Sequence, residues 1–300
     1  MGKPGWLQVL GRAGTRWYTD DAFKHAAAVS FYSLFSLGPI TLGTLTVAGL
    51  LFGRDAARGQ FHDEMVQLVG AQSAGAIESM ALTTAYQHRS AVITVVGLLV
   101  LFFGATSVFI QLQTSLNEIW GVVTRPSRNS WALMIAQRLL SFAMVLSVGF
   151  LLLISLVLNT ALEAVLQRSE VFNAPTWLVR TGNFAVALGV VTALFALLFK
   201  ILPDVRQHWP SVWRGAFVTA LLFSLGRLLI ALYLSHSTVA SVFGAAGSLV
   251  ALLVWIYYSS AILFFGAEFI RAHHDAQGLP VRPKPSAALV RRELVDAGPE

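Results

Sequence analysis

The sequence predicts an all-α polytopic membrane protein, a bundle of about six transmembrane helices with both termini in the cytoplasm. Hydrophobic residues make up 56% of the 300 positions and charged residues 12%, about half the charged share of a soluble domain. The apolar residues occur in long blocks, and roughly 20 such residues cross a bilayer core. In the clearest block, Arg227 is the only charged residue between Arg214 and Glu268. Two crossings are predicted there, with one cation inside the first.

The chain begins with a basic, amphipathic stretch over residues 1–24. Trp6, Leu10, Ala13 and Trp17 fall on one face of a helix, and the cations lie off that face. Rings on one side and cations on the other are typical of a helix that lies among lipid headgroups. We therefore expect an interfacial N-terminal helix.

Six crossings follow from the positions of the apolar blocks. Gly38-Pro39 lies near the middle of the first one, where proline removes a backbone donor and predicts a kinked or broken helix. Together the crossings define a transmembrane domain over residues 25–272. They are predicted over residues 26–52, 91–117, 139–162, 181–199, 215–234 and 242–270.

Two polar regions complete the predicted organisation. Residues 53–90 combine charges with spaced apolar residues and are predicted to form an amphipathic segment on the extracytoplasmic membrane surface. Residues 273–300 are polar and rich in proline. This composition predicts a flexible cytoplasmic tail, with a short helix over residues 288–295.

The orientation follows from the distribution of lysine and arginine. Fifteen of them fall in the N-terminus, the second and fourth loops and the C-terminus, against five in the other three loops. Positive residues collect on the cytoplasmic side of membrane proteins, so this excess predicts cytoplasmic termini. The same distribution accounts for a pI near 10.0 and argues against a nucleic-acid partner.

Arg227 is the sharpest candidate for a functional residue. It lies about 20 Å along a helix from Arg214, a depth at which an arginine without partners costs at least ~2.5 kcal/mol. Ala216 and Ala220 share its helical face, so Arg227 is expected to point into the bundle along a small-residue packing surface. Two interpretations stay open: a contact to an anion such as a phosphate or carboxylate, or a structural arginine bonded to carbonyls.

Other polar residues in the predicted crossings form the rest of the candidate substrate-binding set. Polar side chains on a spanning helix are expected to face protein or water rather than lipid. Hydrogen bonding to a substrate is one interpretation, and helix–helix bonding is the other. For the two glutamates, a proton-coupling role stands beside a simple pair with a basic residue such as Arg271. The set consists of Ser30, Ser33, Thr41, Gln111, Glu118 and Glu268.

The sixth crossing carries a face of small residues at helical spacing. Gly244, Ala251 and Gly266 lie on it, together with Trp255. Small residues let helices approach closely, so packing is favoured over a ligand site on this face.

Catalytic and metal chemistry find no support in the residue pattern. The seven histidines show no zinc-binding spacing, and no phosphate-binding loop, dinucleotide fingerprint or serine nucleophile motif occurs. The chain has no cysteine, which excludes disulfides and thiolate metal ligands. We therefore expect a protein that is not an enzyme and that uses no metal and no cofactor.

Several motifs resemble those of the YihY/BrkB family over residues 20–272. The first is the run Ala-Ala-Ala-Val-Ser-Phe-Tyr-Ser-Leu-Phe-Ser-Leu-Gly-Pro over residues 26–39. The others are Asn117-Glu118-Ile119-Trp120-Gly121, Leu202-Pro203-Asp204, Phe243-Gly244-Ala245-Ala246-Gly247, Trp255-Ile256-Tyr257-Tyr258 and Gly266-Ala267-Glu268. Phe243 stands where the family often has tyrosine. The resemblance implies structural roles for Gly38, Pro39, Trp120, Gly121, Pro203, Gly244, Gly247, Trp255 and Gly266.

The resemblance implies a bacterial inner-membrane protein with about six crossings, and no ribonuclease activity despite an earlier ribonuclease name for the family. It also implies a link to transport of envelope lipids or lipopolysaccharide precursors. The leading hypothesis is a transporter-like protein for an anionic lipid or amphiphile, with a cavity bounded by the first, second, fifth and sixth crossings. The alternatives are an envelope scaffold or accessory subunit and, less favoured, a membrane lipid hydrolase. Membrane lipids are the expected partners, and a homo-oligomer or an envelope partner protein stays open.

Overall fold

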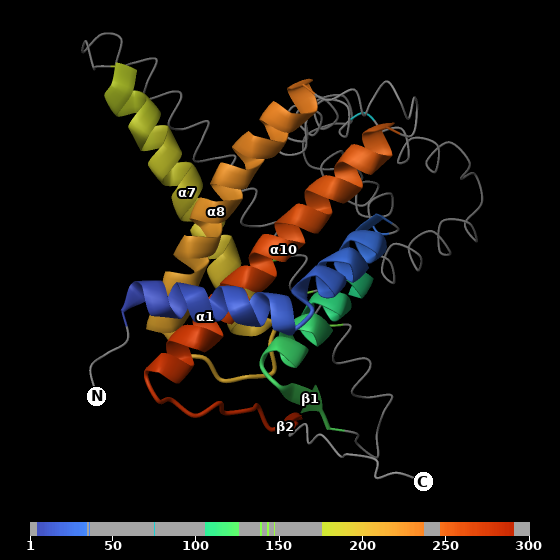
Figure 1. The fold of residues 1–300 in the computed structure, drawn as a ribbon, viewed down its shortest axis with the longest axis vertical. Coiled ribbons are helices and arrows are strands. Elements are labelled where there is room, and N and C mark those ends of the chain that lie inside the picture. Colours follow the sequence, from blue (N-terminus) through green and yellow to red (C-terminus); the bar gives the residue numbers. More distant parts are fainter. Residues whose placement is uncertain are drawn as a thin grey trace, which may run out of the picture.

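The structure, a computed structural model, describes residues 5–34, 36, 75, 106–125, 139, 143, 147, 176–236 and 247–290. Within these residues the chain is mostly helical, with one short two-stranded sheet (Figure 1). Gly38-Pro39, most of the third crossing and all of segment 53–90 except Gly75 lie outside the described residues. The kink, the surface segment and the full number of crossings stay predictions.

Three helices in the described part are long and apolar enough to cross a membrane. They are α7 (Thr176–Ile201), α8 (Trp209–His236) and α10 (Gly247–Ala276), and they cover all or most of the last three predicted crossings. All three extend beyond a predicted bound, α7 and α8 at both ends and α10 at its C-terminal end. The start of α8 lies in the predicted basic loop, because Pro210 is tolerated in a first helical turn, where no backbone donor is required.

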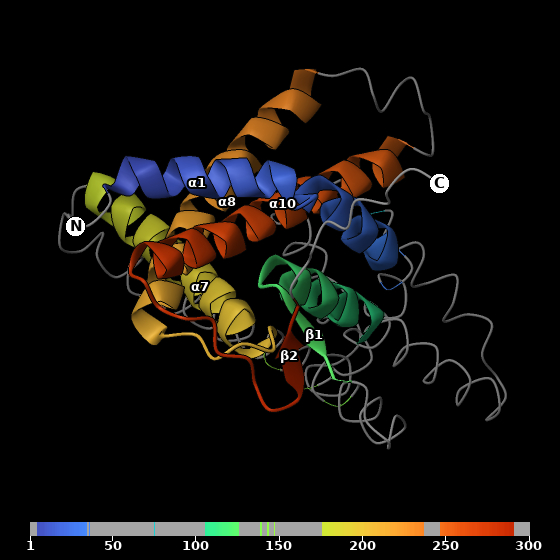
Figure 2. The same cartoon turned by 60° about the horizontal axis from the view of Figure 1, so that its bottom comes forward.

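The three spans pack closely at one end and diverge toward the other (Figures 1 and 2). At the packed end, a methyl group on Gly266 of α10 would overlap Thr219 of α8 and Phe199 of α7. A methyl group on Gly215 would overlap Ile270 in the same way. The predicted close packing through small residues of the sixth crossing is confirmed at Gly266.

Helix α1 (Trp6–Thr19) lies across the packed end of the spans (Figure 1). Its buried residues Val9 and Ala13 pack with Phe269 of α10. The amphipathic helix expected from the sequence is present, but its apolar face is divided between two environments. Small side chains make the buried contact with α10, whereas Trp6 stacks on the Phe269 ring at 5.8 Å and remains 57% exposed, so its outer face can lie among lipid headgroups.

The C-terminal segment is tied to the bundle by a short antiparallel sheet. Strand β1 (Val122–Thr124) pairs with β2 (Ala287–Leu289), and the Lys284 amide donates to the Asp204 carbonyl at 2.8 Å. The predicted helix over residues 288–295 is therefore wrong at residues 288–290, where β2 ends. The predicted tail is held to the bundle through its backbone, although most side chains of residues 277–290 are exposed. The loops after residues 119 and 201 have backbone N–H and C=O groups that no helix pairs. The extended C-terminal segment forms hydrogen bonds with them.

Both described ends of the chain lie at the same end of the bundle. Helix α1 packs against the C-terminal half of α10, and residues 277–290 continue directly from that helix. This arrangement agrees with an even number of crossings between the two ends. The cytoplasmic assignment of that side stays a prediction.

Candidate functional site

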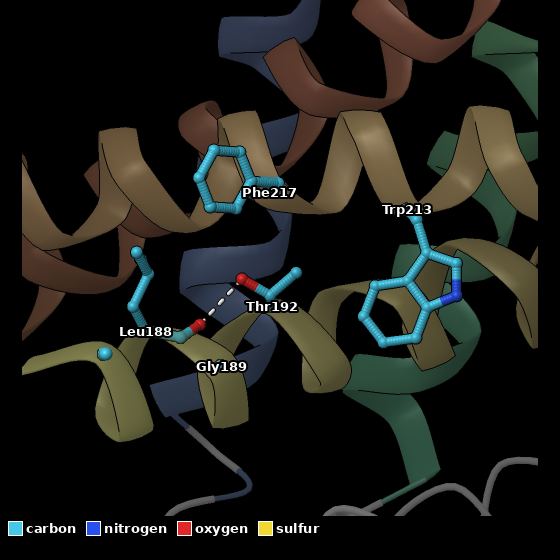
Figure 3. A pocket seen from close by; sticks show the side chains of 6 residues that line it. Leu188, Gly189, Thr192, Trp213 and Phe217 are labelled. Carbon is cyan, nitrogen blue, oxygen red and sulfur yellow. Dashed lines mark hydrogen bonds between the residues drawn. The ribbon is translucent and has the colours of Figure 1, made fainter. Parts of the chain in front are cut away.

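A groove of about 420 Å³ opens between α7 and α8 (Figure 3). Trp213 and Phe217 of α8 are 47% and 48% exposed, so the groove faces the surroundings of the bundle and is not sealed inside it. Its lining consists of Ala185, Leu188, Gly189, Thr192, Trp213 and Phe217.

The groove offers an apolar surface to a ligand. Its one hydroxyl, that of Thr192, donates to the Leu188 carbonyl of the same helix at 2.7 Å and is thereby occupied. Figure 3 shows the six-membered ring of Trp213 turned toward Thr192, with the indole nitrogen directed away. A hydrocarbon chain is the kind of ligand that these side chains suit.

The groove begins near the loop that joins α7 to α8 and extends along α7 past the distance of half a bilayer core. Thr192 lies about 13 Å along the helix from the end of α7 at Ile201, and Leu188 lies about 20 Å from it. Half of a bilayer core is about 15 Å thick. The polar head of a chain seated in the groove would therefore lie near the loop over residues 202–208.

That loop carries cations and aromatic rings. The Lys200 ammonium lies 5.0 Å from the centre of the Trp209 ring and donates to the Gln207 carbonyl. Arg206 and His208 are exposed. Rings and cations at the end of a span are typical of the headgroup level of a membrane. The groove and the loop together suit a molecule with an apolar chain and an anionic head.

A second polar region, the α1–α10 junction, contains Glu268. This residue is completely buried, and neither of its carboxylate oxygens accepts a hydrogen bond from a donor in the part of the chain that the structure describes. Arg271, one turn later, donates to Asp20 at 3.2 Å and to the Ile119 carbonyl. The expected pair between Glu268 and Arg271 is therefore not formed, because Arg271 is directed to other acceptors.

Two of the predicted polar residues on the first crossing are held within the bundle. The Ser30 hydroxyl donates to the Leu253 carbonyl of α10 at 2.9 Å. Ser33 is buried, and its carbonyl accepts a hydrogen bond from the Ser36 hydroxyl at 2.9 Å. The Ser30 bond favours helix–helix bonding at that position, whereas the Ser33–Ser36 bond is local to one segment. Thr41 lies outside the described residues.

The predicted residues of the second crossing also have protein partners. The Gln111 amide donates to the Ser115 hydroxyl at 3.3 Å, and His25 lies 3.1 Å from the Glu118 carboxylate. Glu118 therefore belongs to the same end of the bundle as Glu268, whereas Ser30 contacts α10 about 22 Å further along that helix. The structure does not gather these residues into one site.

Arg227 does not occupy the position expected for it. Its side chain is exposed, although Ala216 and Ala220 on the same helical face are fully buried. Neighbouring Gly226 still packs against the Tyr258 ring of α10, and beyond this contact the two helices diverge (Figure 1). The prediction that Arg227 points into a packed bundle is wrong for this reason, while an anion contact stays a prediction.

The motif at residues 117–121 ends a helix and anchors the C-terminal segment. Trp120 is 2% exposed and meets the His274 ring edge-on at 5.8 Å. Gly121 has a φ of 64°, a left-handed conformation that glycine adopts readily at a helix end. Its carbonyl accepts a hydrogen bond from the Val290 amide at 2.9 Å.

Sequence reasoning missed a buried polar pair that joins two of the motifs. The Asn117 amide donates to the Asp204 carboxylate at 3.0 Å, and the Asp204 backbone amide donates back to the Asn117 side chain at 2.7 Å. Pro203 is buried beside this pair. Of the remaining motif residues, Trp255 packs against Phe223 at 6.0 Å, Gly247 begins α10, and Gly38, Pro39 and Gly244 lie outside the described residues.

The groove was also missed, since its lining comes from two helices that are each apolar all round. The spacing of Trp209 and Trp213, four residues apart on one helical face, was the available signal. Among the residues that the structure describes, no group of three or more histidines, aspartates or glutamates could hold a metal ion.

Comparisons with known proteins agree with the motifs. The family model described as Virulence factor BrkB matches residues 13–289. A UPF0761 membrane protein of Verminephrobacter eiseniae is 28% identical over 268 residues, which cover 87% of this chain and 61% of the relative. Another, from Rhodospirillum centenum, is 28% identical over 276 residues, or 88% and 57% of the two chains. The chain thus spans about three fifths of the length of these relatives, and no solved structure matches it.

Proposed function

This chain belongs to the virulence factor BrkB family, whose relatives are described as membrane proteins, and we propose that it binds an anionic lipid or amphiphile and acts on it as a transporter-like protein. One observation carries the proposal. An apolar groove that is open to the surroundings of the bundle lies beside a loop with cations and aromatic rings. The groove suits the chain of an amphiphile, and the loop suits its head.

Selectivity in this site comes from the head. Inside a bilayer the surrounding lipid tails are as apolar as the groove, so burial of a chain gives no hydrophobic preference for one lipid over another. A positive charge near the membrane surface contributes about 1 kcal/mol toward an anionic head. Exposed Arg206 is the group best able to supply it, because Lys200 already binds the Gln207 carbonyl.

Lipid binding in the groove is tested by a substitution that fills the groove with a large side chain. Gly189 lines the groove, and no atom lies within 4 Å of the position of its missing side chain. Gly189→Phe should therefore place a ring where the ligand chain would lie without disturbing the helix. Gly182→Phe, on the same helix and equally unobstructed, is the matched control. Native mass spectrometry with lipid identification should find the co-purified anionic lipid in wild type and Gly182→Phe, and much less in Gly189→Phe.

The head is tested separately. Arg206→Gln should shift the retained lipid from anionic toward zwitterionic species, whereas Arg12→Gln, also exposed but on α1, should leave the lipid profile unchanged. Equal profiles for all these variants would refute lipid binding at the groove. The scaffold hypothesis would then lead, and a partner protein of fixed stoichiometry would be the expected finding.

Transport is the further step of the proposal. The measurement is the redistribution of a fluorescent anionic lipid across vesicles that contain the full chain. Redistribution that is faster with wild type and Gly182→Phe than with Gly189→Phe supports transport through the groove. Retention of the lipid without redistribution would limit the function to lipid binding.

A further inference from the structure

The α1–α10 junction holds a pair of carboxyl groups with unequal access to water. Glu268 is completely buried, and its neighbours Phe264 and Ala272, one turn away on α10, are at most 1% exposed. The side chain of Asp20, by contrast, is 35% exposed. Asp21 adopts a φ of 54°, a conformation that aspartate tolerates in tight turns, and this turn fixes Asp20 at the end of α1.

The two arginines near Glu268 form their bonds with other groups and not with its carboxylate. Arg271 is bonded to Asp20 and to the Ile119 carbonyl. Arg16 is paired with Asp275 at 2.6 Å. Neither oxygen of Glu268 accepts a hydrogen bond from any donor among the described residues. A bare carboxylate in such surroundings is costly, and taking up a proton removes that cost.

The geometry supplies a second carboxyl group with which the proton can be shared. Arg271 holds the Asp20 carboxylate at 3.2 Å, and Arg271 lies one turn along α10 from Glu268, so the two carboxyl groups lie at the same turn of the junction. Ionised carboxylates are acceptors only, so a hydrogen bond between them requires a proton on one of the two. With one proton present, Glu268 gains the partner that it otherwise lacks.

We propose that Glu268 and Asp20 form a proton-binding site, in which one proton is held between the two carboxyl groups and Arg271 balances the remaining negative charge. Asp20 is the entry to this site: it takes the proton from water and passes it to the Glu268 carboxylate, and release follows the reverse route. The site is independent of the groove between α7 and α8.

Loss of the proton has a structural consequence. A doubly ionised pair leaves the Glu268 carboxylate buried without a donor, and Arg271, one turn away on the same helix, is the nearest cation able to turn toward it. That movement breaks its bond to the Ile119 carbonyl, which joins the end of helix 106–119 to α10. Proton occupancy is thereby coupled to the packing of helix 106–119.

The other titratable groups at the junction are placed as follows. From α1, Asp20 and Arg16 act on the charge of Glu268, and from α10 Arg271 does so. Residues 22–34 and 106–119 contribute the His25–Glu118 pair, in which His25 meets the Phe264 ring edge-on at 5.9 Å. Glu118 is 46% exposed, so it is the natural control for a carboxyl group that water already solvates.

The test is infrared difference spectroscopy of the full chain in lipid nanodiscs, with the pH stepped up and down. Wild type should show a carboxylic-acid carbonyl band that disappears as the pH rises and returns as it falls. Glu268→Gln should lose this band, and Glu118→Gln should keep it unchanged. Asp20→Asn should keep the band at a shifted frequency, because the group that accepts the hydrogen bond has changed.

The same band in wild type and Glu268→Gln, or no titrating band in wild type, would overturn the proposal. A second measurement replaces potassium by sodium at fixed pH. If sodium suppresses the carboxylic-acid band, the site binds a metal cation and the proton-binding proposal is overturned. If Glu268→Gln fails to fold, Asp20→Asn decides, because its partly exposed position makes it the milder change. A band frequency unchanged in Asp20→Asn would overturn the shared pair.

Discussion

Gly266→Ala tests the packed end of the spans most directly. A methyl group at this position overlaps the Thr219 hydroxyl and the Phe199 ring. Neither neighbour can move aside freely. Thr219 is fully buried and donates to the Gly215 carbonyl at 2.7 Å, and Phe199 is 1% exposed. The methyl group must therefore separate α10 from α8 or strain the side chains between them.

The size of the effect follows from two opposing contributions. Overpacking of a tight core costs about 1–3 kcal/mol, and replacing glycine by alanine inside a helix returns about 1 kcal/mol. Gly189→Ala on α7 receives only the second contribution, because its missing side chain has no neighbour within 4 Å. The difference in unfolding free energy between Gly266→Ala and Gly189→Ala should thus isolate the overpacking cost, about 1–3 kcal/mol.

Both variants should be compared with wild type by thermal and denaturant unfolding in one detergent. The double variant Gly266→Ala/Thr219→Ala should regain part of the loss, because it removes the hydroxyl that the new methyl group meets. Phe199 still limits the recovery. If Gly266→Ala and Gly189→Ala change stability equally, α8 and α10 do not touch at Gly266, and close packing of these two helices is refuted.

Three further predictions concern the end of the bundle where the C-terminal segment is bound. Asn117→Ala removes both hydrogen bonds to buried Asp204 and should lower the unfolding free energy by about 2 kcal/mol, measured by denaturant titration; an unchanged midpoint contradicts the pairing. Ala287→Asp places a charge at a 1% exposed position of β2, so proteinase K, which does not require a basic residue, should cleave the segment faster, whereas Leu289→Asp, at a 58% exposed position, should not change the rate. Burial lowers the pKa of Lys284 below its ordinary value of 10.5, so its charge opposes folding, and stability should rise with pH between the lowered folded-state pKa and the unfolded value. Lys284→Met should flatten this rise, and an equally steep rise in the variant would exclude the lysine as its source.

The sequence was sufficient for the elements that the membrane itself imposes. A bilayer core requires long apolar helices, so the last three crossings could be predicted from charge-free blocks, and α7, α8 and α10 confirm them as helices. Close approach through Gly266 was predictable for a similar reason, since a glycine at helical spacing leaves room for a neighbouring helix. The ends of the helices were less predictable, because packing against α1 and the connecting loops decides where they stop.

Polar residues were a poorer guide. For Ser30 and Glu118 the sequence left both a substrate contact and a protein contact open, and each has a protein partner. Arg227 looked buried by helical periodicity, yet it is exposed. Periodicity gives the face on which a residue lies, and the neighbouring helix decides whether that face is covered. The proline-rich C-terminal segment looked solvated for a comparable reason: its backbone partners lie in β1 and near Asp204, far away in the sequence.

By itself, the sequence determined that this is a multi-span membrane protein of the BrkB family, since apolar length and local motifs are properties of contiguous residues. Tertiary structure alone decided which functional groups meet. The groove needs Gly189 and Trp213 on separate helices, and the proposed carboxyl pair needs Asp20 at the turn of α10 that carries Glu268 and Arg271. A binding site depends on distance and burial, and folding creates both by bringing together residues that no local pattern relates.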